Sequence, residues 1–455
     1  MVEKKFVLVG AGSQSFGMKT MTNIIWDLSI FDGSTICLHD IDEIELKRTK
    51  MLADIAVKQL EEISKDPEET ELPKGTLKIE ATLNRKEAFE NADFIISSIE
   101  INRYPLWKMD YYMPVERGSK QIYGENGGPG GTFHSLRIIP PVVEICKDVE
   151  DICPNAYFFN YTNPMSRVCL AIHRATPKVK FAGLCHEFIG MKHRIEAMFR
   201  DILPSNYKSK DFDNYFKMTT AGLNHFAFLQ ELIDLKRNKN LLLEIGPRLK
   251  KGFAEHSPLM WYLYEKFGQV PYTEDSHSGE YIGWARGISN VYGYPWDEVM
   301  KSDEKHRKET LANLEKGLEF FWWMTPTNER VIEIIKGIVL DKGYRELAVN
   351  IPNNGYIPCL WNDVVVEVPA KIDKYGFHGE IINTFPKGIQ GLLRQEAIQH
   401  DLCVEAALTG DKDVLLQCLL LDHTIHDHRD AEKIMNDMLK KQKQYLPQFF
   451  KKETI

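Results

Sequence analysis

A glycine-containing turn near the N-terminus constrains the fold more than any other feature of this sequence. Residues 6–9 (FVLV) form a short apolar run that is typical of a buried strand, and Gly10-Ala11-Gly12 follows it directly. A helical pattern over residues 15–30 comes next. The first glycine permits a tight turn, and the second lets backbone N–H groups approach a pyrophosphate at the positive end of a helix. The pattern predicts a dinucleotide-binding corner, with Gly10, Gly12 and Ser13 as candidate cofactor-binding residues.

An acidic residue supports this interpretation. Asp40 lies just after the second predicted strand, residues 35–38. Such a carboxylate accepts hydrogen bonds from ribose hydroxyls and repels a 2′-phosphate, which favours NAD over NADP. The third glycine of the usual GxGxxG pattern is absent, because Ser15 occupies that position. A plain strand–turn–helix corner with a helix-capping acid is the alternative interpretation.

The order of strand-like and helix-like segments predicts an α/β fold. Further strands are expected at residues 77–81, 94–99, 157–160 and 181–184, and a charged helix at 43–65. Alternating strands and helices predict a Rossmann-like, doubly wound parallel sheet, here over residues 1–195. Longer helical stretches at 303–323 and 395–408, with one strand-like run at 364–368, predict a mixed α+β domain over residues 196–455. The length of 455 residues accommodates two or three domains of ordinary size.

Composition excludes several classes of protein. With 57 Lys and Arg against 65 Asp and Glu, the net charge is −8, and the absence of a long basic run argues against nucleic acid as a partner. No stretch approaches the ~20 apolar residues of a membrane span, and the N-terminus lacks the pattern of a signal peptide. The eight cysteines form no CxxC pair. We therefore expect a soluble, cytoplasmic protein with reduced thiols and no membrane partner.

Polar clusters follow several later strands, where open α/β sheets bind ligands. Cys185 and His186 follow residues 181–184, and His225 ends the Gly222-Leu223-Asn224-His225 motif. A thiolate and an imidazole suit a borderline transition metal. Two residues so far apart in sequence are weak evidence, and structural roles for both are the alternative. His186 is a further candidate ligand.

Taken together, these motifs resemble those of glycoside hydrolase family 4, the NAD- and divalent-metal-dependent glycosidases. The landmarks extend through nearly the whole chain: Gly10-Ala11-Gly12-Ser13, Asp40-Ile41-Asp42, Asn91-Ala92-Asp93-Phe94, Asn163-Pro164-Met165, Cys185-His186, Gly222-Leu223-Asn224-His225 and Asn353-Asn354-Gly355. Residues 127–137 (GGPGGTFHSLR) and 273–281 (TEDSHSGEY) resemble segments of the α-galactosidase and α-galacturonidase members. The chain as a whole is most similar to the α-galactosidase, α-galacturonidase and α-glucosidase branch.

The resemblance implies a hydrolysis that begins with an oxidation, in contrast to the usual displacement by two carboxylates. In this family NAD oxidises the sugar C3 hydroxyl, which acidifies the C2 proton. A base removes that proton, the metal stabilises the enediolate, and the glycosidic oxygen leaves from C1 with help from an acid. Water then adds, and reduction of the C3 ketone regenerates NAD.

The resemblance also implies roles for individual residues. Gly10, Gly12, Ser13 and Asp40 would hold NAD, and Cys185 and His225 would ligate Mn²⁺ or another divalent metal. Asp275 would be the C2 base with Tyr281 in reserve, and Glu125 the acid, although relatives often carry aspartate there. The expected substrate-binding or ligand-orienting residues are Asn163, His186, Asn224, His277 and Arg137, and His134 is a weaker candidate.

Two other functions compete with the glycosidase. A net sugar or hydroxy-acid dehydrogenase on the same scaffold would accumulate NADH, and a non-catalytic nucleotide sensor would need neither thiolate nor metal. The glycone stays open between α-galactoside, α-hexuronide and α-glucoside, and a 6-phosphoglycoside is a further alternative. The expected partners are a small glycoside and a second copy of the chain, in a homodimer or homotetramer.

Overall fold

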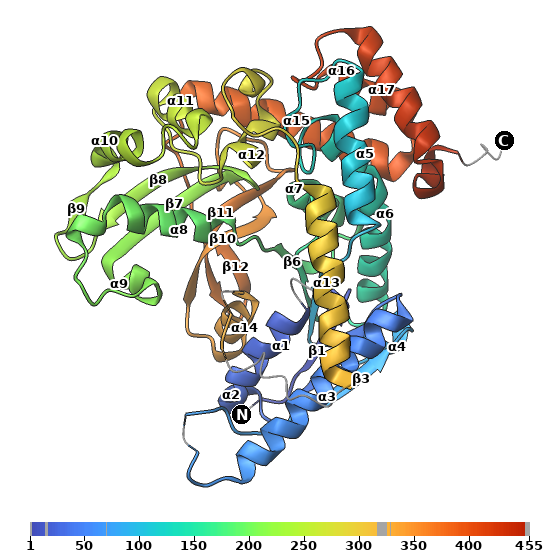
Figure 1. Cartoon of the computed structure of the whole chain (residues 1–455), viewed down its shortest axis with the longest axis vertical. Helices are drawn as coiled ribbons and strands as arrows, with labels where there is room; N and C mark the ends of the chain where they lie inside the picture. Colours follow the sequence, from blue (N-terminus) through green and yellow to red (C-terminus); the bar gives the residue numbers. More distant parts are fainter. Residues whose placement is uncertain (1, 14–16, 70, 316–324, 328, 451–455) are drawn as a thin grey trace.

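The computed structural model describes residues 2–13, 17–69, 71–315, 325–327 and 329–450. Twelve strands in these residues form one continuous mixed sheet (Figure 1). The strands are β1 (Lys5–Val9), β2 (Thr35–His39), β3 (Lys78–Thr82), β4 (Phe94–Ser97), β5 (Tyr157–Asn160), β6 (Lys180–Gly183), β7 (Phe216–Leu223), β8 (Phe226–Asp234), β9 (Lys239–Asn240), β10 (Tyr344–Pro352), β11 (Val365–Asp373) and β12 (Gly376–Gly379). Their order is β3-β2-β1-β4-β5-β6-β10-β11-β7-β8-β9, with β12 paired to β11.

The first six strands form the predicted Rossmann-like half. All five pairings in the order β3-β2-β1-β4-β5-β6 are parallel. Alternate residues of β1 enter different cores: Phe6 and Leu8 pack into one hydrophobic cluster, and Val7 and Val9 into another. Because successive side chains of a strand point to opposite faces, the sheet is buried on both sides, as a doubly wound sheet requires.

Helices cover this sheet, and further helices belong to the second half of the chain. The helices of the first half are α1 (Gly17–Trp26), α2 (Leu28–Phe31), α3 (Glu43–Lys65), α4 (Arg85–Phe89), α5 (Arg103–Glu116), α6 (Gly128–Ile152), α7 (Met165–Ala175) and α8 (Glu187–Met198). The later helices are α9 (Phe212–Tyr215), α10 (Leu242–Gly252), α11 (Pro258–Phe267), α12 (Asp275–Ser278), α13 (Trp296–Glu315), α14 (Val331–Leu340), α15 (Lys387–Thr409), α16 (Lys412–Leu420) and α17 (His428–Lys441). Figure 1 shows α5 and α6 grouped with α15, α16 and α17 at one end of the molecule.

The second half extends the same sheet in the antiparallel sense. Strand β10 pairs with β6, with Asn350 opposite Gly183, and β11 then joins β10 to the β7–β8 hairpin. The α/β fold class with a mixed second half is thus confirmed. The predicted boundary after residue 195 falls inside α8, and the sheet continues from β6 to β10 without a break in strand pairing.

Several helices and strands begin or end at other residues than the sequence predicted. The helix expected over residues 15–30 is divided into α1 and α2 around Asp27, and Ser15 lies outside the described residues. The strand expected to reach residue 99 ends at Ser97, because the Ile99 N–H donates to the Thr162 hydroxyl at 3.0 Å rather than to a neighbouring strand. Helix α13 begins earlier than residue 303, and residues 316–323 of that prediction lie outside the described residues.

None of the described helices combines the length and apolar character needed to cross a lipid bilayer. All eight cysteines lie in the described part of the chain and carry free thiols.

Candidate functional site

The glycine turn lies at the carboxyl ends of β1 and β2. Gly10 has a φ of +77°, and a Cβ there would lie 2.3 Å from the Ser98 carbonyl oxygen, so the position requires glycine. The Gly12 N–H donates to Asp40 Oδ2 at 2.8 Å. The Ser13 hydroxyl lies 3.4 Å from the Ser98 hydroxyl. The structure therefore brings together the four residues predicted to bind a dinucleotide.

Cys185 and His225 face each other across the sheet edge. Cys185 follows β6, and His225 lies in the two-residue turn between β7 and β8 with a φ of +60°. The Tyr272 hydroxyl accepts the His225 backbone N–H at 3.0 Å, which stabilises this uncommon left-handed conformation. Cys185 Sγ lies 3.3 Å from His225 Nε2.

The pKa shifts of Cys185 and His225 indicate how this pair would respond to a bound cation. Burial lowers the pKa of His225 well below its usual range, and the neighbouring His277 and His186 lower it further, so the imidazole is neutral. Burial raises the pKa of Cys185 well above its usual range, and the carboxylates of Glu367 and Glu187 raise it further. A bound divalent cation would supply the positive charge that stabilises the thiolate.

The spacing of the pair also fits a shared metal ion. Metal distances of ~2.3 Å to sulfur and ~2.1 Å to nitrogen place two adjacent ligand atoms roughly 3.1–3.6 Å apart. The observed 3.3 Å lies in this range. No group of three or more His, Cys, Asp or Glu residues in a metal-binding arrangement occurs in the described part of the chain. The protein would thus contribute two ligands and leave positions open for substrate and water, as catalytic metal sites do.

A buried carboxylate, that of Glu367, forms hydrogen bonds with residues that contact the two candidate ligands. Glu367 of β11 is 1% exposed, and its Oε2 accepts the side-chain amides of Asn224 at 2.7 Å and Asn350 at 2.9 Å. Asn224 also hydrogen-bonds the thiol of Cys185, and Tyr272 hydrogen-bonds the carboxyl of Glu367. Burial raises the pKa of Glu367, and the bonds from Asn224, Tyr272 and Asn350 oppose the rise. Glu367 is therefore linked to Cys185 through Asn224 and to the backbone of His225 through Tyr272.

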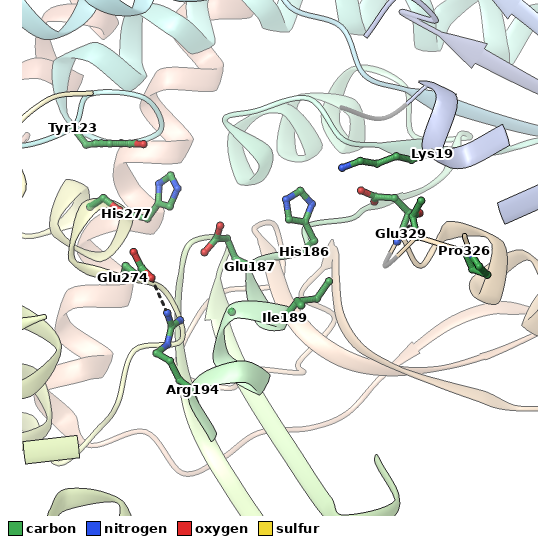
Figure 2. Close-up of a pocket in the computed structure, with 13 residues that line it drawn as sticks. Lys19, Tyr123, His186, Glu187, Ile189, Arg194, Glu274, His277, Pro326 and Glu329 are labelled. Carbon is green, nitrogen blue, oxygen red and sulfur yellow. Dashed lines mark hydrogen bonds and ion pairs between the residues drawn. The ribbon is translucent and has the colours of Figure 1, made fainter. Parts of the chain in front are cut away.

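A cavity of about 690 Å³ opens beside the pair. Figure 2 shows its walls, which come from α1, α8 and the segment around α12. His186 follows Cys185 directly, and the ring of His277 stacks on that of His225 with centroids 4.3 Å apart; both line the cavity. Lys19 lines its other end from α1, the helix that follows the glycine turn. The cavity therefore lies between His186 and His277, which neighbour the candidate ligands, and helix α1, which follows the glycine turn.

Glu280 organises the glycine-rich segment near this cavity. Its Oε1 accepts the backbone N–H groups of Glu125 at 2.6 Å and Asn126 at 2.8 Å. Its Oε2 lies 3.3 Å from His277 Nδ1. Burial lowers the pKa of His277, but the hydrogen bond that its ring donates to Glu280 and the charges of Glu187, Glu280 and Glu125 together outweigh burial and raise the pKa to about 9. The side chain of Glu125 is buried, and its Oε1 is paired with Arg103 at 2.5 Å.

Asn163 follows β5 at a cis peptide bond with Pro164. Its side-chain Oδ1 is buried, with no hydrogen-bond partner among the described residues. An unpaired buried acceptor of this kind is costly unless a ligand or water satisfies it. The position of Asn163 is therefore the one expected of a residue whose side chain accepts a hydrogen bond from a ligand hydroxyl.

Sequence comparison identifies the family. The profile of "Family 4 glycosyl hydrolase" matches residues 5–200, and that of "Family 4 glycosyl hydrolase C-terminal domain" matches residues 220–425.

The chain belongs to glycosyl hydrolase family 4.

Individual relatives support this membership over nearly the full length. An α-glucosidase of Erwinia rhapontici is 36% identical, and the alignment covers 97% of this chain and 98% of the relative. An α-galacturonidase of Thermoanaerobacter italicus is 26% identical over 97% of both chains. The crystal structure of a 6-phospho-α-glucosidase from gut microorganisms, in complex with NAD and Mn²⁺, superposes with a TM-score of 0.81 at 21% identity and covers 98% of this chain and 99% of that one. This last likeness shows that the two proteins share the same fold.

Two of the predicted catalytic residues lie outside the cavity of this family-4 chain. Both oxygens of Asp275 accept backbone N–H groups at the start of α11, from Leu259 at 2.9 Å and Met260 at 3.0 Å. That position suits a helix cap rather than a base. Tyr281 is 3% exposed and packs against Phe226 with ring centroids 5.1 Å apart, which is the position of a core residue.

Arg137 requires a correction. The sequence predicted that it contacts substrate, but it is 2% exposed in α6 and pairs with Asp110 of α5, with Nη2 to Oδ2 at 2.7 Å. Gln442 accepts a further bond from its guanidinium at 2.8 Å. Arg137 therefore joins helices within the core. His134 also has a partner within the protein, because its Nε2 lies 3.1 Å from Glu100 Oε2.

Sequence reasoning missed Glu367, Glu280 and Glu187. Glu367 interrupts a run of valines, and a charged residue in an otherwise apolar strand was the signal available for it. Glu280 lies in the TEDSHSGEY segment, in which only Asp275, His277 and Tyr281 were considered as site residues. Glu187 directly follows Cys185 and His186 in sequence and lines the cavity.

Proposed function

We propose that this family-4 enzyme hydrolyses α-glycosidic bonds of α-galactosides, α-hexuronides or α-glucosides with NAD and Mn²⁺, or another divalent metal, as cofactors. The observation that carries the proposal is the 3.3 Å Cys185–His225 pair beside a cavity that extends to Lys19 of α1, the helix that follows the glycine turn. The activities of the α-glucosidase and α-galacturonidase relatives support the substrate class. The NAD and Mn²⁺ bound to the related 6-phospho-α-glucosidase agree with the proposed cofactors.

The residues of this chain divide between the two cofactors. When bound, NAD would accept and return a hydride at the sugar C3, and the cation would stabilise negative charge on the sugar oxygens. Gly10, Gly12 and Ser13 would hold the dinucleotide phosphates, and Asp40 would accept a ribose hydroxyl. Cys185 and His225 would ligate the cation.

The substrate would lie against the cavity walls. The buried Oδ1 of Asn163 would accept a sugar hydroxyl, and His186 and His277 would orient the substrate from the cavity wall. Asn224 would position Cys185 from beneath. Glu125 would act as the acid, with Arg103 fixing the direction of its carboxyl group.

A substrate panel tests this function. The purified protein would be incubated with NAD⁺, Mn²⁺ and a reductant on p-nitrophenyl α- and β-glycosides, both free and 6-phosphorylated. We expect p-nitrophenol release from an α-glycoside without accumulation of NADH. Steady NADH formation from a sugar, with no hydrolysis of any glycoside, would overturn the proposal in favour of a dehydrogenase.

We also propose that the chain acts in the cytoplasm as a homodimer or homotetramer. The free thiols, including the proposed ligand Cys185, support a reducing compartment. Large exposed apolar side chains, such as Leu243 at 91% and Tyr375 at 78%, support burial against a second copy. Light scattering on the purified protein would test the oligomeric state.

A further inference from the structure

A group of aromatic side chains begins at the cavity wall and continues beyond it. Tyr123 is half-buried and lines the cavity, and Figure 2 shows its hydroxyl directed into the cavity beside His277. The ring of Tyr123 meets those of Trp107 and Tyr294 edge to face, with centroids 5.1 Å and 5.9 Å apart. Tyr104 is parallel to Tyr294 within 4°. We name Tyr104, Trp107, Tyr123 and Tyr294 the aromatic corner.

Trp107 holds the aromatic corner in place from within the protein. It is 4% exposed, and its ring stacks on that of Tyr294 with centroids 4.4 Å apart. Its indole Nε1 donates to the backbone carbonyl oxygen of Tyr123 at 3.1 Å, and the ring of Trp296 packs against it edge to face at 5.8 Å. The aromatic corner is therefore ordered without a ligand, so binding there carries no entropic cost for ordering it.

The tyrosines of the aromatic corner differ in what their hydroxyls bind. The Tyr104 hydroxyl donates to Asp303 Oδ2 at 3.0 Å, whereas those of Tyr123 and Tyr294 have no hydrogen-bond partner among the described residues. Burial raises the pKa of Tyr123, and the nearby Glu125 carboxylate raises it further, so this hydroxyl stays protonated. A protonated phenol donates one hydrogen bond, and its ring presents an apolar surface.

These properties match those of a sugar ring. A pyranose has apolar C–H groups on its faces and hydroxyl groups around its rim, so aromatic rings pack against the former and polar groups bind the latter. Ligand sites in proteins combine apolar and aromatic walls with a few polar groups in this way. Tyr123 and Tyr294 are both half-buried, and each supplies ring surface together with a hydroxyl that no protein group engages.

Arg103 connects the aromatic corner to the proposed acid. Its guanidinium lies over the rings of Trp107 and Tyr104, at 5.4 Å and 5.9 Å from the centroids, and pairs with Glu125 Oε1 at 2.5 Å. Tyr123 precedes Glu125 by two residues. An acid must lie within hydrogen-bonding reach of the oxygen that it protonates, here the glycosidic oxygen. The aromatic corner therefore lies on the side of the cavity where the leaving group of the substrate would depart.

The opposite end of the cavity would face the other side of the sugar. Lys19 of α1 lines that end, and α1 follows the glycine turn that is proposed to hold NAD (Figure 2). Hydride transfer requires the sugar C3 to face the dinucleotide. Because C3 and C1 lie on either side of C2, a sugar bound in this way directs its C1 substituent towards the Tyr123 end.

We infer that the aromatic corner binds the leaving sugar of an α-linked disaccharide or oligosaccharide, with the rings of Tyr123 and Tyr294 against its C–H groups and the Tyr123 hydroxyl donating to one of its oxygens. This inference rests on the proposed function and extends it to the part of the substrate beyond the glycosidic bond. Binding energy from this remote part would orient the bond for cleavage, so a sugar leaving group favours turnover over a small one.

The first test varies the leaving group and keeps the glycone. The glycone that the p-nitrophenyl panel identifies is supplied as its methyl α-glycoside and as an α-linked disaccharide: maltose or isomaltose for glucose, melibiose for galactose, digalacturonate for galacturonate, and a 6′-phosphorylated disaccharide for a 6-phosphosugar. Both forms have unactivated alcohols as leaving groups, so the comparison reports on binding rather than on leaving-group chemistry.

We expect kcat/KM of the NAD- and Mn²⁺-loaded enzyme to be about 10-fold or more higher for the disaccharide than for the methyl glycoside. Equal values would overturn the inference and leave the glycosidase function intact. A p-nitrophenyl panel without any hydrolysis would instead overturn the proposed function.

The second test changes the aromatic corner. Tyr294→Leu removes an aromatic ring and should lower the ratio of kcat/KM on the disaccharide to that on the methyl glycoside about 10-fold. Tyr123→Phe removes one hydroxyl and should lower the same ratio about 3-fold or more. Tyr294→Phe keeps the ring and should keep the ratio of the wild type. Tyr375→Leu, at an exposed turn between β11 and β12, is the matched control.

An unchanged ratio in both Tyr294→Leu and Tyr123→Phe would overturn the inference, and so would equal losses on the two substrates, because a purely structural role affects both alike. Tyr123→Phe differs from the wild type by one oxygen atom without a partner among the described residues. It therefore tests the aromatic corner even if Tyr294→Leu does not fold.

A binding measurement separates this inference from catalysis. NADH cannot accept a hydride, so enzyme loaded with NADH and Mn²⁺ binds its substrates without turnover. Calorimetric titration should give an affinity about 10-fold higher for the disaccharide than for the methyl glycoside in the wild type, and nearly equal affinities in Tyr294→Leu. Equal affinities in the wild type would contradict the inference even if the disaccharide is hydrolysed faster.

Discussion

Cys185 Sγ and His225 Nε2 lie 3.3 Å apart although 40 positions separate them in the sequence. Their strands, β6 and β7, are separated in the sheet by β10 and β11. The contact therefore depends on the way the second half of the chain extends the Rossmann-like sheet.

Replacement of the thiol tests the proposed metal site. Cys185→Ser should weaken Mn²⁺ binding at least 10-fold, because a hydroxyl is a poorer ligand than a thiolate, while NAD affinity changes less than about 2-fold. Mn²⁺ binding can be followed by electron paramagnetic resonance and NAD binding by calorimetry. Cys359→Ser, at another partly buried cysteine, serves as the control. Equal Mn²⁺ affinities in both variants would remove Cys185 from the site.

The buried Glu367 should affect Mn²⁺ binding although it is not itself a proposed metal ligand. Glu367→Gln keeps the shape of the side chain but removes a negative charge for which the described residues provide no ion pair. We expect Mn²⁺ affinity to fall about 10- to 100-fold, as is usual when a residue that supports metal ligands is lost. The melting temperature without metal should be maintained, since the uncompensated charge is gone. A lower metal-free melting temperature with unchanged Mn²⁺ affinity would indicate a purely structural role.

Substitution of the first glycine should impair the dinucleotide site. Gly10→Ala forces a Cβ to within 2.3 Å of the Ser98 carbonyl at a φ of +77°. We expect a loss of about 2 kcal/mol or more in the free energy of unfolding and at least a 10-fold loss in NAD affinity. Gly252→Ala is the control, because a Cβ at Gly252 has nothing within 4 Å. Similar behaviour of the two variants would contradict the steric argument.

Loss of the buried Arg137–Asp110 pair should affect stability rather than substrate binding. Arg137→Met leaves the Asp110 carboxylate buried without its cation, at a cost of about 3–5 kcal/mol in urea unfolding experiments. The double variant with Asp110→Leu should recover much of this loss, because an uncharged pair carries no desolvation penalty. An increase in KM without a loss of stability would restore Arg137 to the substrate site.

The dependence of stability on pH provides a further test. Burial raises the pKa of Glu100, but the charges and hydrogen bonds of His134, followed by Arg103, overcome this effect and lower it to about 2. A carboxyl group whose folded pKa lies below its unfolded value of 4.5 stabilises the protein above pH 4.5. That contribution is lost as the pH falls from 4.5 towards 2.

The matching variant is Glu100→Gln. At pH 7 it should reduce the free energy of unfolding by an amount of the order of 3 kcal/mol, and the difference from wild type should shrink between pH 5 and pH 3. Urea unfolding at a series of pH values measures this difference. A constant difference would show that the charge of Glu100 is not responsible, and Glu144→Gln at an exposed position is the control.

Local signals in the sequence predicted the fold well. The Val-rich run before Gly10 and the acid after the second strand predicted the strand–turn–helix corner proposed to bind the nucleotide, since strand, turn and helix there are set by adjacent residues. The residue types and their places after predicted strands indicated the Cys185–His225 pair only weakly, and the family resemblance strengthened the prediction, because spacing alone does not reveal which strands become neighbours.

The sequence failed where a side chain finds its partner far along the chain. Arg137 was predicted to contact substrate, and the sequence did not reveal its actual partners, Asp110 and Gln442, because they lie 27 and 305 residues away. Asp275 has the residue type of a base, but only the structure shows that the start of α11 occupies both of its oxygens. The division of the chain after residue 195 stays a prediction.

The pairing of β6 with β10 has a consequence for how the enzyme evolves and unfolds. Because backbone hydrogen bonds at Gly183 and Asn350 join the two halves, neither half has a complete sheet edge of its own. Truncation between them would expose unpaired strands that favour aggregation, so the halves should melt in one cooperative transition. Exchange of the second half as an independent module between family members would require that the strand pairing at this seam be preserved.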